Sequence, residues 1–468
     1  MLLNIKIQTQ QMTKITHKIT VITMIFAMAN LTAFAQKKHC QQNIFTGNPI
    51  VPNIGLDDGH MRVFGDRIYD YASHDYSAES NSFVLKLWWI WSTKDLVTWT
   101  FEGSLSPDVL SFPEGYKDCW ATDALSRNGK YYWYLCNPKK TFVVVADSPA
   151  GPWKSPMGDK PLMEGRDPGA FIDDNGKAYL VTGLWNYSIA ELGDDMISLT
   201  EKPKIIEIIN PRGPYNEDGK NTQQPTDDKP YLHKHKGKYY LSWGCYYAMA
   251  DNIYGPYTYK GCFVVDERTE PEFRQQKAGL THDRHGSFFE WNNQTYFNCN
   301  DLSSNGATKF WRNTIIMYIH YRDNGEIEPA YINKIGVGQY DASAGRIEAE
   351  NYYSKTDAEK RQNNENGFEM RSFSNSSSLI YANVMNLSQN SELTFRVSSE
   401  NTGGAVIEVW SDGKDSQLLG ICKVPETGGK YKIVKCRLKN KAEKQNIRLS
   451  FKGTGSELLR MDWICFKK

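Results

Sequence analysis

Four aspartates and one histidine recur at a nearly constant distance before a repeated, tyrosine-containing turn. They lie 9 to 12 residues ahead of the turn tyrosines, and in chain order they are Asp58, Asp123, Asp167, Asp228 and His285. A single aspartate in such a place usually starts a strand or caps a turn. Five coincident positions favour a shared site, because gathered acids are costly unless they perform chemistry or bind a metal. The pattern therefore predicts acid–base chemistry, cation binding or both.

The turns that follow these residues form a loose internal repeat. The five copies are Gly65–Tyr69, Asn128–Tyr132, Asn175–Tyr179, Lys236–Tyr240 and Asn292–Tyr296, and successive tyrosines are 63, 47, 61 and 56 residues apart. Turn residues between two short strands are typical of β-hairpins. A repeat of this length built from short strands predicts radially arranged sheets, here a five-bladed β-propeller. Equivalent positions of the blades converge on the central channel, so the four carboxylates and the imidazole are expected to meet there.

Composition excludes several kinds of partner. The 55 basic and 54 acidic residues nearly balance, which argues against nucleic acid or an anionic membrane as the main partner. The 13 tryptophans and 27 tyrosines fit β-structure and also fit stacking against sugar rings. Nine cysteines, an odd number without Cys-x-x-Cys spacing, argue against a disulfide framework and against a zinc site.

Residues 1–35 are typical of a secretory signal peptide. A basic start is followed by a largely apolar run from Ile19 to Phe34, and Ala33-Phe34-Ala35 resembles a cleavage site. The apolar run is too short and wrongly flanked for a membrane span. We therefore expect export to the periplasm or secretion, and no membrane-spanning segment.

The rest of the chain divides into two all-β domains. Residues 45–340 read as strands and turns without a helical apolar period, and they form the expected propeller domain. Residues 346–468 contain alternating segments such as Glu392–Ser398 and Ala405–Trp410. Short alternating strands over this length predict a β-sandwich of the jelly-roll kind.

Several motifs in order resemble glycoside hydrolase family 43. They are Asp58-Gly-His-Met-Arg-Val-Phe64, Trp120-Ala-Thr-Asp123, Asp167-Pro-Gly-Ala-Phe171 and the stretch Thr281–Ser287, within residues 48–340. The tail, from Ile347-Glu-Ala-Glu350 to Met461-Asp-Trp463, resembles a family 6 carbohydrate-binding module. The resemblance implies an inverting, exo-acting glycoside hydrolase that removes terminal sugars from the side chains of an oligosaccharide or polysaccharide. An α-L-arabinofuranosyl group is the first expectation, with β-D-xylosidase and galactose- or galactofuranose-releasing activities as alternatives.

The resemblance also implies three catalytic acids. Asp58 corresponds to the general base, and Asp123 corresponds to the second-blade aspartate that tunes the pKa of the acid and orients it. The acid of the family is a Glu in a Glu-x-Pro motif, and here that place reads Asp227-Asp228-Lys229-Pro230. Asp228 therefore takes the position of the acid, with a carboxyl about 1.5 Å further back because Asp is one methylene shorter.

This departure from the family pattern leaves three alternatives open. Asp228 acts as the acid on a backbone that has moved inward, or Glu217 in the preceding loop supplies the proton. In the third alternative the propeller binds carbohydrate without cleaving it.

The remaining candidates bind substrate or calcium. His60, His74, Trp120 and Asp167 are expected to bind substrate, although packing between blades is an equally simple role for each ring. The resemblance implies a calcium ligand at His285 on the propeller axis, where a satisfied channel histidine is the alternative. It also implies a calcium site in the sandwich formed by Glu348, Glu350 and Asp462, whose oxygens are ligands that Ca²⁺ prefers.

Overall fold

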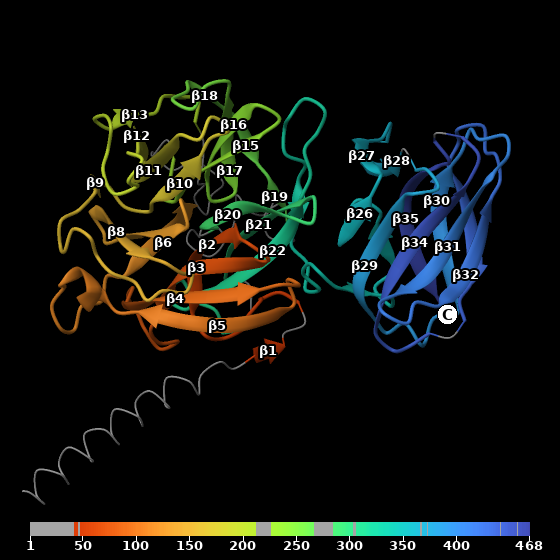
Figure 1. The fold of residues 1–468 in the computed structure, drawn as a ribbon, viewed down its shortest axis with the longest axis horizontal. Helices are drawn as coiled ribbons and strands as arrows, with labels where there is room; N and C mark the ends of the chain where they lie inside the picture. Colours follow the sequence, from red (N-terminus) through yellow and green to blue (C-terminus); the bar gives the residue numbers. More distant parts are fainter. Residues whose placement is uncertain are drawn as a thin grey trace, which may run out of the picture.

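The computed structural model describes residues 42–44, 47–211, 226–265, 284–302, 306–365, 367–371, 373–439, 441–455 and 457–468. The predicted signal peptide and Glu217 lie outside these residues. The described part is built from β-strands, joined by one short 3₁₀ turn at Pro107–Leu110, which confirms the all-β prediction. Figure 1 shows a rounded N-terminal body beside a flatter C-terminal one. No helix of the described residues is long and apolar enough to cross a membrane.

Five sheets follow one another along the N-terminal body. The first contains β1 (Gln42–Ile44), β2 (Leu56–Phe64), β3 (Arg67–Asp75), β4 (Leu85–Thr93) and β5 (Thr98–Leu105), and the second contains β6 (Trp120–Arg127), β7 (Lys130–Cys136), β8 (Lys140–Ala146) and β9 (Met163–Glu164). The third contains β10 (Gly169–Ile172), β11 (Ala178–Leu184), β12 (Asn186–Glu191) and β13 (Lys204–Ile205). The fourth contains β14 (Ile208–Ile209), β15 (Pro230–His235), β16 (Lys238–Trp243), β17 (Tyr246–Ala250) and β18 (Tyr257–Cys262). The fifth contains β20 (Gly286–Trp291), β21 (Gln294–Asp301) and β22 (Asn313–Ile319), and β19 (Val264–Val265) pairs with β23 (Ala330–Tyr331).

The first strands of the five sheets lie around a common centre. β2 contacts β6, β6 contacts β10, β10 contacts β15, β15 contacts β20, and β20 contacts β2. Each recurring acid or histidine lies in one of these strands or within two residues of its start. This arrangement, a β-propeller, brings the five predicted positions around the common centre.

The hairpin turns behave as their sequences predict. Asn128 and Gly129 both have positive φ, 54° and 75°, as do Lys236 and Gly237 at 46° and 80°. Positive φ at both central residues is the requirement of the type I′ turn, whose twist matches that of paired strands. Large aromatic side chains then fill the spaces between sheets, and Trp88, Trp133 and Trp243 are buried there.

Each propeller sheet takes its strands from one stretch of chain, so the first and last sheets share no strand. Side-chain hydrogen bonds join them instead. The Asn48 side chain donates to the Ile316 carbonyl and accepts from the Ile316 amide, both at 2.9 Å. Asn298 Nδ2 donates to the Gly59 carbonyl at 2.7 Å, and the Met61 amide donates to Ser287 Oγ at 2.7 Å. These bonds stabilise the junction at which the chain returns to its first sheet.

The C-terminal body is a sandwich of two sheets. One contains β24 (Tyr340–Asp341), β26 (Ser354–Thr356), β29 (Ser378–Met385), β31 (Ala405–Asp412), β32 (Leu418–Val424) and β34 (Gln445–Gly453). The other contains β25 (Arg346–Glu348), β27 (Glu359–Gln362), β28 (Phe368–Arg371), β30 (Glu392–Ser398), β33 (Lys432–Arg437) and β35 (Arg460–Lys467). Alternate residues of β31 are buried, as expected for a strand with one face on a core.

A polar network joins the two bodies. Gln294 at the start of β21 donates to the Glu350 carbonyl at 2.6 Å and accepts from Lys360 Nζ at 2.7 Å. Lys360 Nζ also lies 2.9 Å from His320 Nδ1, and Tyr352 donates to the Asn293 carbonyl at 2.7 Å. The sandwich is therefore docked on the outer edge of the fifth sheet.

Candidate active site

Asp58 is the most firmly held of the recurring acids. It lies at a β-bulge in β2 with φ of 47°, a left-handed conformation that is uncommon outside glycine. Arg312 Nη1 donates to both carboxylate oxygens, at 2.8 and 2.9 Å, and Asn300 Nδ2 donates to Oδ1 at 2.7 Å. His285 Nδ1 lies 3.4 Å from Oδ1. Burial alone would raise the pKa of Asp58, but Arg312, His285 and Asn300 hold it well below its usual range.

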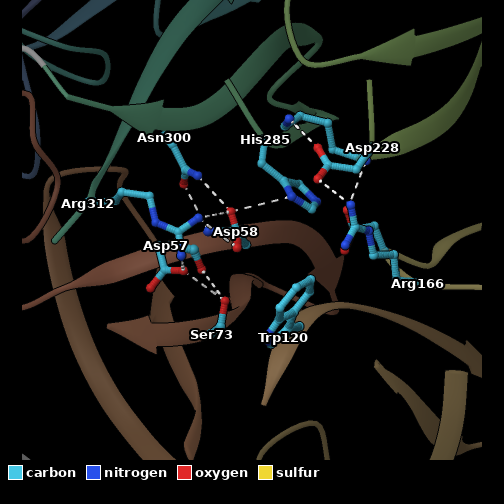
Figure 2. Close-up of polar contacts among 12 residues, drawn as sticks. Asp57, Asp58, Ser73, Trp120, Arg166, Asp228, His285, Asn300 and Arg312 are labelled. Atoms are coloured by element: carbon cyan, nitrogen blue, oxygen red, sulfur yellow. Dashed lines mark hydrogen bonds and ion pairs between the residues drawn. The ribbon is translucent and has the colours of Figure 1, made fainter. Parts of the chain in front are cut away.

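Arg312 was not predicted, and it is the central cation of this part of the site. Besides Asp58 it contacts Asp57 through Nη2 and Asp75 through Nε and Nη2, the last two at 3.0 Å. Figure 2 shows the guanidinium between Asp57 and Asp58. Its position depends on the pairing of the fifth sheet with the first, which no local pattern encodes. The available signal was an arginine directly before the apolar strand β22 and two asparagines, Asn298 and Asn300, inside β21.

Asp57 is enclosed and supports the site rather than facing it. Its carboxylate accepts from Ser73 Oγ and from the Asp75 amide, both at 2.9 Å. Burial, and then the charges of Asp75 and Asp58, raise the pKa of Asp57 against the effect of Arg312. These contacts agree with the preference for Asp58 over Asp57 as the reactive carboxylate.

Asp228 lies across from Asp58, beyond His285 (Figure 2). Its side chain is 27% exposed, and each of its oxygens meets a cation. Lys229 Nζ contacts Oδ1, and Arg166 Nη2 lies 3.3 Å from Oδ2. Burial would raise the pKa of Asp228, but Lys229 and then Arg166 lower it. Lys229 and Arg166 were not predicted, although both adjoin predicted residues in the sequence.

Asp167 is the carboxyl that is coupled most closely to Asp228. It precedes β10 with φ of 55°, its Oδ2 accepts the Lys229 amide at 3.0 Å, and its amide donates to Cys136 Sγ at 3.2 Å. Burial and then the charge of Asp228 raise the pKa of Asp167 well above its usual range. The pKa of Asp167 is therefore shifted upward and that of Asp228 downward, so the two carboxyls respond to each other in opposite directions.

Asp123, which was predicted to tune and orient the acid, lies among groups of the first three sheets. Asp123 is fully buried and accepts from Arg62 Nε, the Ala170 amide and the Ala124 amide, each at 2.7 Å. His60 Nδ1 lies 3.2 Å away. Burial would raise the pKa of Asp123, but Arg62 and His60 lower it to about 2. Its described contacts join the first three sheets and do not include Asp228.

Two predicted substrate-binding histidines pack against aromatic rings, with His60 buried and His74 half-buried. His60 is 0% exposed and lies edge-on to Tyr231, with ring centroids 4.9 Å apart. His74 stacks on Trp89 at 3.6 Å, and its Nδ1 lies 3.2 Å from the Gly55 carbonyl oxygen. Burial lowers the pKa of His74. The structure thus places both rings in packing positions, the alternative that the sequence left open.

Aromatic rings lie on the same face as the acids. The Trp120 ring faces the space near Asp58 and Asp228 (Figure 2), with the Arg166 guanidinium 5.1 Å from its centroid. Trp185, which was not predicted, is 42% exposed in the β11–β12 turn and has φ of 64°. Its amide donates to the Asp227 carbonyl at 3.0 Å, and its carbonyl accepts from Thr226 Oγ1 at 2.6 Å. Flat apolar faces of this kind suit sugar rings.

His285 lies between Asp58 and Asp228 on the propeller axis (Figure 2). Its Nε2 is buried and has no hydrogen-bond partner among the described residues. Burial lowers the pKa of His285 to about 3, so the ring is neutral. Across the described ranges, no three His, Cys, Asp or Glu side chains are grouped closely enough to hold a metal ion, so a calcium ion at His285 stays a prediction.

The three sandwich carboxylates line one cavity of about 380 Å³ beside the domain junction. Arg346 Nε lies 2.6 Å from Glu348, and Arg396 Nη1 lies 2.5 Å from Asp462. Glu350 Oε2 is buried without a partner in the part of the chain described. Arginines thus neutralise two of the three carboxylates, and calcium at this place also stays a prediction.

Two family models match the chain. The model of glycosyl hydrolases family 43 matches residues 46–327, and that of the family 6 carbohydrate binding module matches residues 348–468. The structure of a family 43 arabinoxylan arabinofuranohydrolase from Bacillus subtilis covers 90% of this chain and 97% of its own, with 24% identity and a TM-score of 0.52. This likeness supports the propeller and sandwich fold.

Sequence relatives extend over both domains. An arabinoxylan arabinofuranohydrolase from Paenibacillus polymyxa is 26% identical over 89% of this chain and 73% of its own length. One from Bacillus subtilis is 26% identical over 89% of this chain and 91% of its own. A xylosidase/arabinosidase from Bacteroides ovatus is 27% identical over 46% of this chain and 80% of its own. The solved β-xylosidase/α-arabinofuranosidase from a compost microbial metagenome, in a calcium-free form, is 26% identical over 62% of this chain, with a TM-score of 0.52.

Proposed function

The chain belongs to glycosyl hydrolases family 43, and from this premise we propose that it is an inverting, exo-acting enzyme that releases terminal α-L-arabinofuranosyl groups from polysaccharide side chains. That it is a glycoside hydrolase follows from the family. The choice of sugar is carried by one observation, that relatives named arabinoxylan arabinofuranohydrolases align with 89% of the chain, across both domains. Relatives named xylosidases make β-D-xylosidase the next candidate. A relative named β-D-galactofuranosidase makes a galactofuranose-releasing activity a further candidate.

In this proposal Asp58 is the general base. Inversion needs an ionised carboxylate that activates a water, placed roughly 6.5–9.5 Å from a protonated carboxyl. Arg312 and Asn300 keep Asp58 ionised and fix its orientation, which supports the assignment. Its left-handed backbone is a form of strain common at functional sites.

Asp228 is the proposed general acid, and Asp167 takes the place that the sequence suggested for Asp123. Two interacting carboxyls share protons, so the charge of one governs the protonation of the other. Asp167 is the partner that responds to Asp228, as the direction of its pKa indicates. A proton must reach Asp228 before it can protonate a leaving-group oxygen.

A carbohydrate-binding propeller without hydrolysis is the second candidate. The observation in its favour is that both oxygens of Asp228 contact cations, because a paired carboxylate is a poor proton donor.

A substrate screen separates these candidates. Aryl glycosides of arabinofuranose, xylose and galactofuranose, together with arabinoxylan oligosaccharides, would be incubated with the full chain and with the Asp58→Asn variant. Release of arabinose by the wild type alone supports the proposal, and release of another sugar changes the substrate. Oligosaccharide that binds in calorimetry and stays intact supports the binding protein.

We also propose that the protein is exported and that it binds calcium. Export depends on the signal-like residues 1–35. Calcium would be held by His285, or by Glu348, Glu350 and Asp462, and it is supported by the unpartnered His285 Nε2 and Glu350 Oε2. Calcium titration by calorimetry, repeated with Glu350→Gln, checks the sandwich site.

A further inference from the structure

Lys229 occupies an unusual place between three carboxylates. Its φ of 62° lies in the left-handed region, which long side chains seldom adopt. Its amide donates to Asp167 Oδ2 at 3.0 Å, and its Nζ lies 2.9 Å from Asp227 Oδ2 and in contact with Asp228 Oδ1. The side chain is 7% exposed, so the ammonium lies inside the site. Strain of this kind persists only where several contacts maintain it.

The ammonium stands where a substrate oxygen must come. A general acid has to lie about 2.6–3.2 Å from the oxygen that it protonates. Both Asp228 oxygens are already engaged, Oδ1 by Lys229 and Oδ2 by Arg166. Charge-assisted hydrogen bonds are stronger than neutral ones, so a neutral leaving-group oxygen competes poorly against a cation. Withdrawal of one of the two cations would raise the affinity of Asp228 for a proton and open one of its oxygens to the leaving group.

Lys229 is the cation that can withdraw without losing its charge partner. Its Nζ already contacts Asp227 at 2.9 Å, so a rotation of the flexible side chain keeps one ion pair. Arg166 is restrained by its planar group and by the Trp120 ring 5.1 Å away. Among the described residues, Asp167, Asp227, the neutral His285 and the hydroxyl of Tyr187 also interact with Asp228.

We propose that Lys229 is a positioning residue that competes with the leaving-group oxygen for Asp228 and moves onto Asp227 when substrate binds. The inference rests on the proposed function, because it assumes that Asp228 donates the proton. It makes Lys229 and Asp227 a pair that controls when the acid is available. Their effects on proton donation should be opposite in sign.

The test compares Lys229→Met, Asp227→Asn and the control Lys177→Met in the full chain. Lys177 is exposed and pairs with Glu191 on the third sheet, away from the acids. For Lys229→Met we expect the ratio of kcat on an arabinoxylan oligosaccharide to kcat on a 4-nitrophenyl glycoside to rise on the order of tenfold at neutral pH, because nitrophenolate leaves without a proton. The alkaline limb of the pH profile should move to higher pH. Asp227→Asn should lower the ratio, and Lys177→Met should leave it unchanged.

Results that contradict the role of Lys229 can be told apart from results that contradict the proposed function. If Lys229→Met lowers both rates equally, or moves neither the ratio nor the pH limb, Lys229 is a structural residue and the inference is overturned. If the wild type cleaves no glycoside, the proposed function fails. In that case hydrolysis gained by Lys229→Met or by the less strained Lys229→Gly still supports competition for Asp228, and no gain overturns it.

Discussion

Single residues of the site divide into those that spacing reveals and those that only the fold brings together. The offset before each turn identified Asp58, Asp167, Asp228 and His285, and all four lie at one face of the propeller. Spacing could not identify Arg312, since it reaches Asp58 from 254 positions away. Spacing also does not say which carboxyl is the partner of the acid. The resemblance pointed to Asp123, whose described contacts do not include Asp228.

The two proposed catalytic carboxyls should differ in their dependence on the leaving group. Asp228→Asn should slow hydrolysis of natural oligosaccharides on the order of 10²–10⁴-fold, because a sugar alcohol needs a proton to leave. A 4-nitrophenyl glycoside should be spared much of that loss. Asp58→Asn should slow both substrates alike, since each needs the activated water. Steady-state kinetics on the two substrates checks this, and wild-type behaviour of Asp228→Asn would remove Asp228 from the mechanism and turn attention to Glu217.

Arg312 should contribute strongly to stability as well as to the site. Arg312→Met leaves Asp57, Asp58 and Asp75 without their shared cation, which typically costs about 3–5 kcal/mol. The pKa of Asp58 is lowered in the folded state, so this stabilisation is present above the unfolded pKa and is lost as pH falls toward the folded one. Urea unfolding at pH 7 and pH 4 should show a smaller difference from wild type at pH 4. A difference that grows on acidification would contradict the assignment.

Elements were easier to predict than their ends. Hairpin turns such as Asn128-Gly129 predicted the blades of the propeller. The alternation of apolar and polar residues predicted the strands of the sandwich. The Leu184–Asn186 turn carries no such signal, because a tryptophan with positive φ is contrary to turn preferences. It is held by hydrogen bonds to residues 226 and 227, some 40 positions further along.

This turn suggests a role for Trp185 in binding the leaving group. The ring is exposed, and its backbone is bonded to the segment that carries Asp228. We expect Trp185→Ala to raise KM for arabinoxylan oligosaccharides about 3- to 10-fold, in line with ~1 kcal/mol for an aromatic contact. KM for a small aryl glycoside should change less. Equal changes for both substrates would indicate a structural effect on the acid instead.

At the scale of the whole molecule, the sequence predicted the order of the domains but not the residues through which they contact each other. Length and motif order indicated a propeller followed by a sandwich. The junction includes Gln294, His320, Asn351, Tyr352 and Lys360, polar residues scattered through both domains. Nothing in their local sequence distinguishes them from surface residues.

The junction should respond to pH through Lys360. Burial lowers the pKa of Lys360 to about 7, against the effect of Glu350. Between pH 7 and about 10 the unfolded chain binds a proton there that the folded chain does not, so stability rises with pH across this window. Unfolding at pH 6, 8 and 9.5 should show this rise in the wild type and a flatter profile in Lys360→Met. Parallel profiles would place the titration elsewhere.

The last sheet supplies the groups that hold Asp58. The site is therefore completed late in synthesis of the chain. The ribosome releases the chain from its N-terminus at about 5–20 residues per second, and 254 positions separate Asp58 from Arg312. For roughly 10–50 s the nascent chain therefore carries its base without the cation that orients it. Under the proposed roles, a polypeptide still being translated is inert toward sugars. Under these roles the site itself delays activity during synthesis, because it is complete only once the fifth sheet contacts the first.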